Sequence, residues 1–107
     1  MIRNIIHEET SILDSMRLMS ELGEKCLVVV DSDNKVLGTL SDGDLRKAIL
    51  RSISVSERII NVYQREPFLL GLDDIKNEEL LRKLFLENKF DVLPVINETG
   101  ELVDVLS

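Results

Sequence analysis

Apolar and polar positions follow the same order twice along this chain. Residues 25–38 run from five consecutive apolar residues through a polar stretch to a second apolar segment, and residues 91–104 repeat that order at an offset of 66 without a gap. Each copy predicts a strand, a tight turn and a second strand. Asn34 and Gly100 stand in the two turns, and both residue types tolerate the positive φ that such turns often need.

Helical stripes precede both hairpins at three- and four-residue spacing. The apolar residues of the stripes are Ile12, Leu13, Met16, Met19 and Leu22 in the first copy and Leu80, Leu81, Leu84 and Phe85 in the second. Thr10 or Ser11 is expected to cap the first helix, and the second follows Asn77. We interpret the methionines as core residues, because their flexible side chains fill gaps well.

A further helix is predicted directly after the first hairpin, in residues 42–51, where Leu45, Ala48 and Ile49 share one face. Residues 52–66 contain too many apolar side chains for a free tether, so this linker is expected to pack against the core. Residues 67–70 then open the second copy as a short extended segment, as residues 2–6 open the first.

Each copy therefore predicts an extended segment, a helix, two strands and a closing helix, which is an α/β (α+β) architecture. The first repeat spans residues 1–55 and the second residues 56–107. The second repeat stops at Ser107, within its expected last strand and before its closing helix. We expect a fragment of a longer protein; the alternative is a degenerate repeat that ends there.

Composition narrows the class of protein. The 20 acidic residues exceed the 13 basic ones, and the formal net charge of −7 argues against a nucleic-acid partner. One cysteine, Cys26, and one histidine, His7, provide neither an internal disulfide nor a zinc ligand set. The longest apolar run, residues 26–30, is far shorter than the roughly 20 residues of a membrane span. A cytoplasmic domain without a membrane partner is expected.

Two short motifs resemble those of CBS domains. Residues 38–44, GTLSDGD, resemble that family's pattern of glycine, two apolar or small residues, Thr/Ser, two variable residues and Asp. Residues 93–97, LPVIN, resemble its Leu-Pro-Val-Val-Asp strand. The resemblance covers the whole chain as a CBS pair, or Bateman module. Residues 38–46, 53–55 and Pro67 also resemble the CBS pairs fused to bacterial sugar-phosphate nucleotidyltransferases, which implies a catalytic part beyond this chain.

The residues alone leave two interpretations of Asp42 and Asp44: half of a metal or acid–base site, or caps of the following helix. The resemblance implies a third. At its matching positions, Asp44 would hold ribose hydroxyls and Ser41 a phosphate or ribose oxygen. Gly38 would let the ligand approach the backbone, and Thr39 would lie beside the base. A carboxylate suits a diol because it accepts hydrogen bonds from both hydroxyls.

The family's clefts join the motif of one repeat to the opening segment of the other. Phe68 and Leu69 are therefore expected to form an apolar wall facing the first motif, although core packing is an alternative for Phe68. In the second repeat Asp104 stands in the place of Gly38, and the chain ends before a second ribose-binding Asp. The second cleft is therefore expected to be damaged or empty.

Charge also bears on the ligand. Asp91 would repel a phosphate. The positive charge that binds a phosphate would have to come from Arg46, Lys47 or Arg65, and each of these is alternatively a solvated surface charge. The net charge of −7 disfavours ATP without a metal and leaves AMP or a related adenosyl compound.

The resemblance thus implies a regulatory module that senses an AMP-like ligand for a fused enzyme. We expect this module to have no catalytic residues, metal or tightly bound cofactor of its own. The alternative is a structural dimerisation module with ligand-free clefts, in which the helical stripes are shared between core and homodimer interface. A free-standing enzyme finds no support, since the sequence offers no nucleophile–base pair or phosphate loop.

Overall fold

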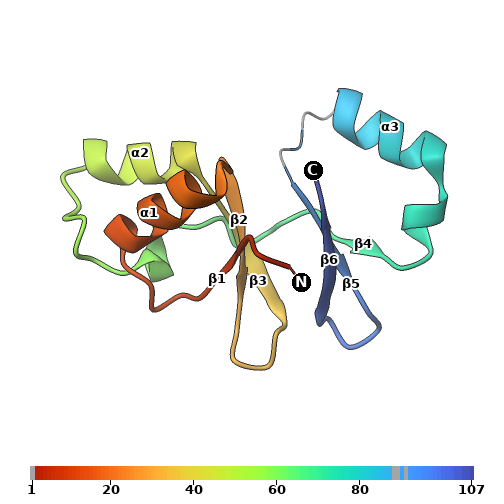
Figure 1. Cartoon of the computed structure of the whole chain (residues 1–107), viewed down its shortest axis with the longest axis horizontal. Helices are drawn as coiled ribbons and strands as arrows, with labels where there is room; N and C mark the ends of the chain where they lie inside the picture. Colours follow the sequence, from red (N-terminus) through yellow and green to blue (C-terminus); the bar gives the residue numbers. More distant parts are fainter. Residues whose placement is uncertain (1, 88–89, 91) are drawn as a thin grey trace.

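Two three-stranded sheets stand side by side in the computed structural model, which describes residues 2–87, 90 and 92–107 (Figure 1). In each sheet the middle strand is parallel to the first strand and antiparallel to the last. The first sheet contains β1 (Ile5–Ile6), β2 (Cys26–Val30) and β3 (Val36–Ser41); the second contains β4 (Leu70–Gly71), β5 (Leu93–Ile96) and β6 (Leu102–Leu106). This is the mixed α+β architecture expected from the sequence.

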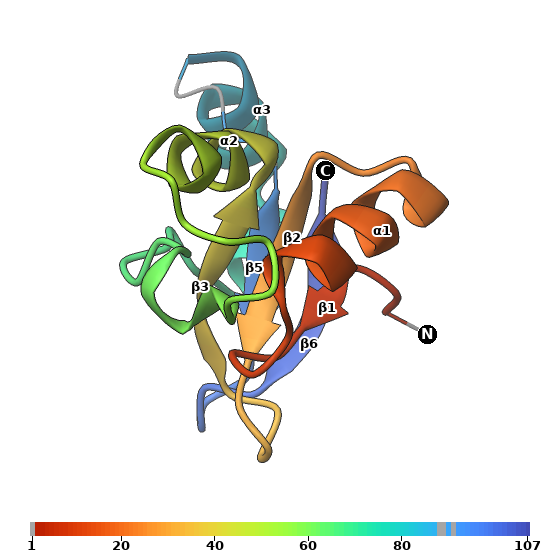
Figure 2. The same cartoon turned by 90° about the vertical axis from the view of Figure 1, so that its left-hand side faces the viewer.

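Helices lie on the outer sides of the paired sheets, so that the sheets face each other in the middle (Figures 1 and 2). The helices are α1 (Ile12–Leu22), α2 (Asp42–Leu50) and α3 (Glu78–Glu87), and two 3₁₀ turns are η1 (Ile59–Asn61) and η2 (Asp74–Lys76). None of the helices among the described residues is long and apolar enough to cross a membrane.

The predicted repeat is confirmed at the level of strand register. The pairing shifts between Val29 and Val30 in the first hairpin and between Val95 and Ile96 in the second. Asn34 and Gly100 both adopt a positive φ, 63° and 88° respectively. Two hairpins with the same irregularity at the same offset are equivalent structural units.

Strand β2 is buried on both faces, which explains its uninterrupted apolar sequence. Leu27 and Val29 pack with residues of α1 and α2 in the core of the first half. Cys26, Val28 and Val30 belong instead to a second core. That core lies between the sheets and includes Val92 and Leu102, with Ile2, Ile5, Val36 and Val105 packed against it.

Hydrogen bonds also join the tips of the two hairpins. The Val36 backbone N–H donates to the Gly100 carbonyl at 3.2 Å, and the Leu102 N–H donates to the Asn34 carbonyl at 2.9 Å. The Asn34 side-chain amide donates to the Leu102 carbonyl at 2.9 Å. The two halves are therefore fixed to each other by polar contacts as well as by the core between the sheets.

Helix α1 departs in one respect from the predicted stripe. Ser11 caps it, as expected, by accepting a hydrogen bond from the Asp14 backbone N–H at 3.0 Å. Met19 is buried, but Leu13 and Met16 are 37% and 39% exposed, and Ser15 is fully buried. Ser15 is tolerated there because its hydroxyl donates to the Ser11 carbonyl at 2.8 Å.

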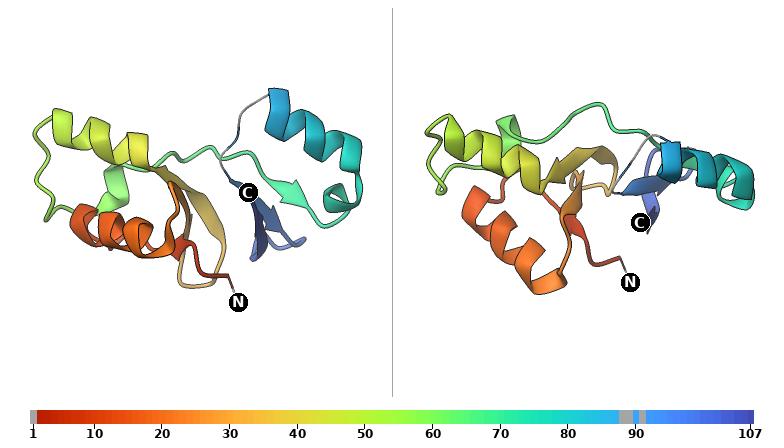
Figure 3. Two further views of the ribbon diagram at one scale, coloured as in Figure 1. Left: turned by 45° about the horizontal axis from the view of Figure 1, so that its top comes forward. Right: turned by 90° about the horizontal axis from the view of Figure 1, so that it is seen from above.

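The linker packs, as predicted. Ile59 and Tyr63 lie in the core of the first half, although both follow the repeat boundary predicted after Val55, and that boundary stays a prediction. Beyond Tyr63 the chain crosses to β4 and the second half (Figure 3). That half ends with β6, one residue before Ser107, so no counterpart of α2 occurs in the described part of the chain.

The core between the sheets makes Leu102 a test of how the halves are held together. We expect Leu102→Ala to lower the free energy of unfolding by about 2–5 kcal/mol, because it leaves a cavity between the sheets. Leu86→Ala is the matched control, since Leu86 is 71% exposed on α3. Urea unfolding followed by circular dichroism measures both. Equal effects of the two substitutions would contradict this packing.

Candidate functional site

Ser41 and Asp44 meet where β3 ends and α2 begins. Ser41 is the N-cap of the helix, and its hydroxyl accepts a hydrogen bond from the Asp44 backbone N–H at 3.1 Å. Asp44 Oδ2 accepts one from the Ser41 backbone N–H at 2.9 Å, which completes a capping box. Asp42 instead forms an exposed ion pair with Arg46 at 3.0 Å. Helix capping is thus the interpretation that the structure supports for Asp44, with Ser41 as its partner.

The second carboxylate oxygen of Asp44 contacts the linker. Gln64 Nε2 donates a hydrogen bond to Asp44 Oδ1 at 3.1 Å, so both oxygens of this carboxylate have partners. Asp44 is only 8% exposed, whereas Gln64 lies at the surface. Sequence reasoning missed Gln64, because nothing in its local pattern marks a residue 20 positions away as a partner of Asp44.

Gly38 and Thr39 form the edge of β3 on which the linker docks. Thr39 and Gln64 exchange two backbone hydrogen bonds, of 3.0 and 2.9 Å. A Cβ atom at Gly38 would lie 1.9 Å from the Gln64 carbonyl oxygen and 2.7 Å from Tyr63 Cδ2. The absent side chain therefore lets the linker approach β3. A ligand approaching Gly38 or Thr39 stays a prediction.

Tyr63 fastens the linker to the segment that precedes α1. Its hydroxyl donates to Glu8 Oε2 at 2.6 Å and accepts from Arg65 Nη1 at 2.7 Å. The Arg65 guanidinium lies 4.6 Å from the centre of the Tyr63 ring, and Arg65 Nη1 is 3.5 Å from Glu8. Burial and the neighbouring Glu8 carboxylate raise the pKa of Tyr63 to about 12. The contacts of Arg65 with Tyr63 and Glu8 thus stabilise the docked linker.

A small hollow of about 120 Å³ lies beside Asp44, between α2 and the linker. Lys47 lines it from α2 and Arg51 from the C-cap of that helix, at three and seven residues beyond Asp44. Asn61 and Gln64 line it from the linker. Of the basic residues singled out in the sequence, only Lys47 lies in this hollow, since Arg46 pairs with Asp42 and Arg65 with Glu8. Arg51 was not considered as a cation for the ligand, although its helical spacing from Asp44 was visible in the sequence.

The structure places Phe68 and Leu69 with the second half of the molecule. The ring of Phe68 lies 5.2 Å from that of Phe90, centre to centre, and 46% of Phe68 is exposed. Leu69 lines a hollow of about 520 Å³ together with Asn97 and Glu98. Their role as a wall facing residues 38–44 stays a prediction.

The end of the second hairpin faces the opening segment of the first half. A hollow of about 420 Å³ is lined by Ile2, Arg3, Asn4, Val103, Asp104 and Val105. Asp104 Oδ1 accepts a hydrogen bond from the Val105 backbone N–H at 2.8 Å.

Asp91, expected to repel a phosphate, lies outside the described residues. Among residues 2–87, 90 and 92–107, no three His, Cys, Asp or Glu side chains come together as a metal site.

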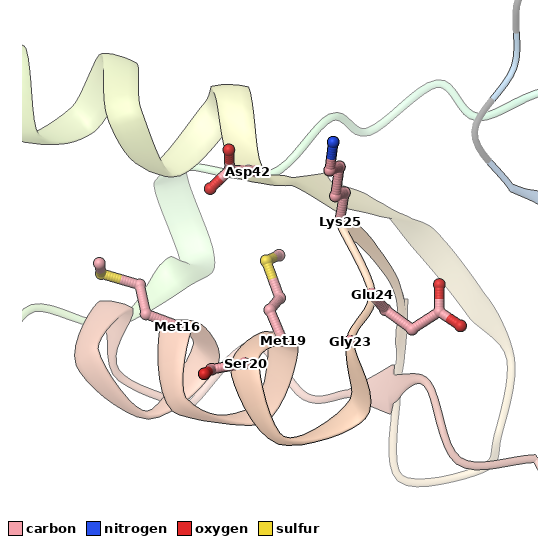
Figure 4. Close-up of a pocket in the computed structure, with 7 residues that line it drawn as sticks. All are labelled: Met16, Met19, Ser20, Gly23, Glu24, Lys25 and Asp42. Atoms are coloured by element: carbon pink, nitrogen blue, oxygen red, sulfur yellow. The ribbon is translucent and has the colours of Figure 1, made fainter.

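The hollow in Figure 4 lies between α1 and the start of α2. Its volume is about 410 Å³, and Met16, Met19 and Asp42 line it together with Ser20, Gly23, Glu24 and Lys25. Met16 is half-exposed here rather than part of the core. This hollow includes neither Ser41 nor Asp44.

Comparison with known proteins finds one family model that matches the first half of the chain. Residues 2–51 match the model described as the CBS domain. An uncharacterized protein of Helicobacter pylori (strain J99) is 30% identical over 104 residues, which are 95% of this chain and 31% of that protein. A homoserine O-acetyltransferase of Methanosalsum zhilinae is 28% identical over 103 residues, 94% of this chain and 20% of that protein. The chain thus spans a third or less of these relatives.

Solved structures extend the match to both halves. The CBS-pair protein CBSX2 from Arabidopsis thaliana is 26% identical, with a TM-score of 0.78 over 96% of this chain and 78% of that one. CBSX2 has also been crystallised in complex with AMP. This match confirms the prediction that the chain has the fold of a CBS pair.

The contact between Gly38 and the linker predicts opposite effects for two Gly→Ala substitutions. Gly38→Ala must displace the Gln64 backbone, so we expect a loss of about 1–3 kcal/mol in the free energy of unfolding. Gly43→Ala, in the first turn of α2 with only Ser41 Oγ near at 3.7 Å, should be neutral or stabilise by up to about 1 kcal/mol. Urea unfolding measures both, and a tolerated Gly38→Ala would contradict the docking.

Tyr63 is the only tyrosine, so tyrosinate absorbance reports its ionisation alone. The folded chain binds this proton more tightly than the unfolded chain, whose tyrosine has a pKa near 10. We therefore expect stability that is fully present below pH 10 to be lost as the pH rises towards 12. Glu8→Gln should lower the pKa, whereas Glu9→Gln should leave it unchanged. An unperturbed titration in the folded chain would contradict the cluster.

Proposed function

Because residues 2–51 match the CBS-domain model and the whole chain has the fold of a CBS pair, we propose that it is a regulatory module for an adenosyl ligand of the AMP kind. The module itself is regulatory rather than catalytic. The observation that carries the proposal is the capping box at the start of α2, where each of the Ser41 and Asp44 side chains accepts a hydrogen bond from the backbone N–H of the other residue. CBSX2, which shares the fold, was crystallised with AMP, and this supports the choice of ligand.

The proposed binding mode assigns one part of the ligand to each residue. The 2′,3′-hydroxyls of the ribose donate to Asp44, because a carboxylate has lone pairs for two donors. The phosphate accepts a hydrogen bond from the Ser41 hydroxyl and is stabilised by the positive end of the α2 dipole. Thr39 lies beside the base, and Gly38 offers no side chain against it. Phe68 and Leu69 supply the apolar wall from the second half.

Charge favours a monophosphate over a triphosphate. Arg46 and Arg65 are paired with acidic residues, which leaves Lys47 and Arg51 as the cations lining the hollow beside Asp44. The chain as a whole carries a net charge of −7, which repels a polyanion. We therefore propose that AMP binds more tightly than ATP in the absence of a divalent cation.

The module would act on an enzyme to which it is fused. The match to part of a homoserine O-acetyltransferase supports fusion to an enzyme in general. The resemblance of residues 38–46 and 53–55 points to a sugar-phosphate nucleotidyltransferase. Control of that enzyme requires that the ligand bind two arrangements of the module with different affinity.

The exposed faces of α1 and α2 favour a second function, dimerisation through the helices. Leu13, Met16 and Ile49 are 37–42% exposed there, and Leu50 is 77% exposed. The hollow beside Met16 offers space for a side chain of a second copy (Figure 4). In this alternative the clefts bind nothing, and the module joins two copies of its parent protein.

Isothermal calorimetry of the chain with AMP, ADP, ATP and S-adenosylmethionine tests the proposed function. We expect AMP to bind and Asp44→Asn to weaken its binding by roughly tenfold or more, since a charged acceptor for hydroxyls is lost. Asp42→Asn is the matched control: it removes the same charge two residues away, from a carboxylate paired with Arg46. Circular dichroism confirms that both variants are folded.

Two results would contradict the proposal. No heat with any of the four compounds at millimolar concentration, combined with a dimer in sedimentation equilibrium, supports the dimerisation alternative. Equal losses of AMP affinity in Asp42→Asn and Asp44→Asn would show that net charge matters and that the position of Asp44 does not.

A further inference from the structure

Each oxygen of the Asp44 carboxylate accepts one hydrogen bond from within the chain. Oδ2 holds the Ser41 backbone N–H at 2.9 Å, and that bond is part of the helix cap. Oδ1 faces the linker and accepts from Gln64 Nε2 at 3.1 Å. Ribose hydroxyls that donate to Oδ1 therefore meet an oxygen that already accepts one N–H donor.

The side chain of Gln64 can leave Asp44 without undocking the linker. The backbone of Gln64 is held by two hydrogen bonds to Thr39, of 3.0 and 2.9 Å. The neighbouring Tyr63 is held by its hydrogen bond to Glu8. Gln64 is exposed, so its amide regains hydrogen bonds to water when it swings away. The energetic change on release is therefore small and confined to one side chain.

We propose that Gln64 is a built-in competitor for the ribose-binding carboxylate. Its amide N–H donates to Asp44 Oδ1, and ribose hydroxyls compete with the amide for this oxygen. This inference rests on the proposed function, because it concerns the same carboxylate. Competition by Gln64 lowers the ligand affinity below the value that Ser41 and Asp44 would give by themselves. It also favours a ligand with two hydroxyls over one with a single donor.

Gln64→Ala tests the competition directly. The substitution removes the amide and retains the backbone bonds to Thr39, so we expect AMP to bind roughly three- to tenfold more tightly in calorimetry. Asn61→Ala is the matched control, since Asn61 is an exposed amide of the same linker that lines the same hollow. It should leave the dissociation constant unchanged. Thermal unfolding checks that both variants retain the fold.

The outcomes separate this inference from the function on which it rests. Tighter binding in Gln64→Ala alone supports both, including the case in which only this variant binds AMP measurably. Binding by the wild type with an equal or weaker affinity in Gln64→Ala overturns the competition and leaves the proposed function standing. No binding by the wild type or either variant overturns both. Equal gains in both variants overturn the competition, since loosening of the linker would then explain them.

Discussion

The burial of β2 on both faces is the constraint on which the rest of the structure depends. One face of this strand completes the core with α1 and α2, and the other packs against the second sheet. Its neighbour β3 is therefore fixed at both ends: the hydrogen-bonded hairpin tips hold one, and the start of α2 holds the other. Ser41 and Asp44 stand at that second end, so their geometry is set by the core.

The linker adds a second constraint at the same place. It lies against β3 where Gly38 has no side chain, it pairs with Thr39, and the Glu8–Tyr63–Arg65 cluster holds it down. The residues that resemble the family's ligand motif thus also serve the docking of the chain's own linker. Under the proposed function, a ligand at this edge would share polar groups with the linker, so its binding would be coupled to the local structure.

The sequence predicted features that depend on local pattern. The offset between the copies predicted both hairpins and the positive φ of Asn34 and Gly100, and the apolar composition of the linker predicted its packing. The partnership of Gln64 with Asp44, 20 residues apart, and that of Tyr63 with Glu8, 55 residues apart, left no local signal. Helical spacing likewise could not show that Ser15 would be buried while Met16 stayed half-exposed.

A crystal structure of the chain grown with saturating AMP tests the central claim most directly. We expect the ribose hydroxyls within hydrogen-bond distance of Asp44 Oδ1 and the Gln64 amide turned away, with the backbone bonds between Thr39 and Gln64 intact. AMP bound elsewhere, with the bond from Gln64 to Asp44 unbroken, would contradict the account.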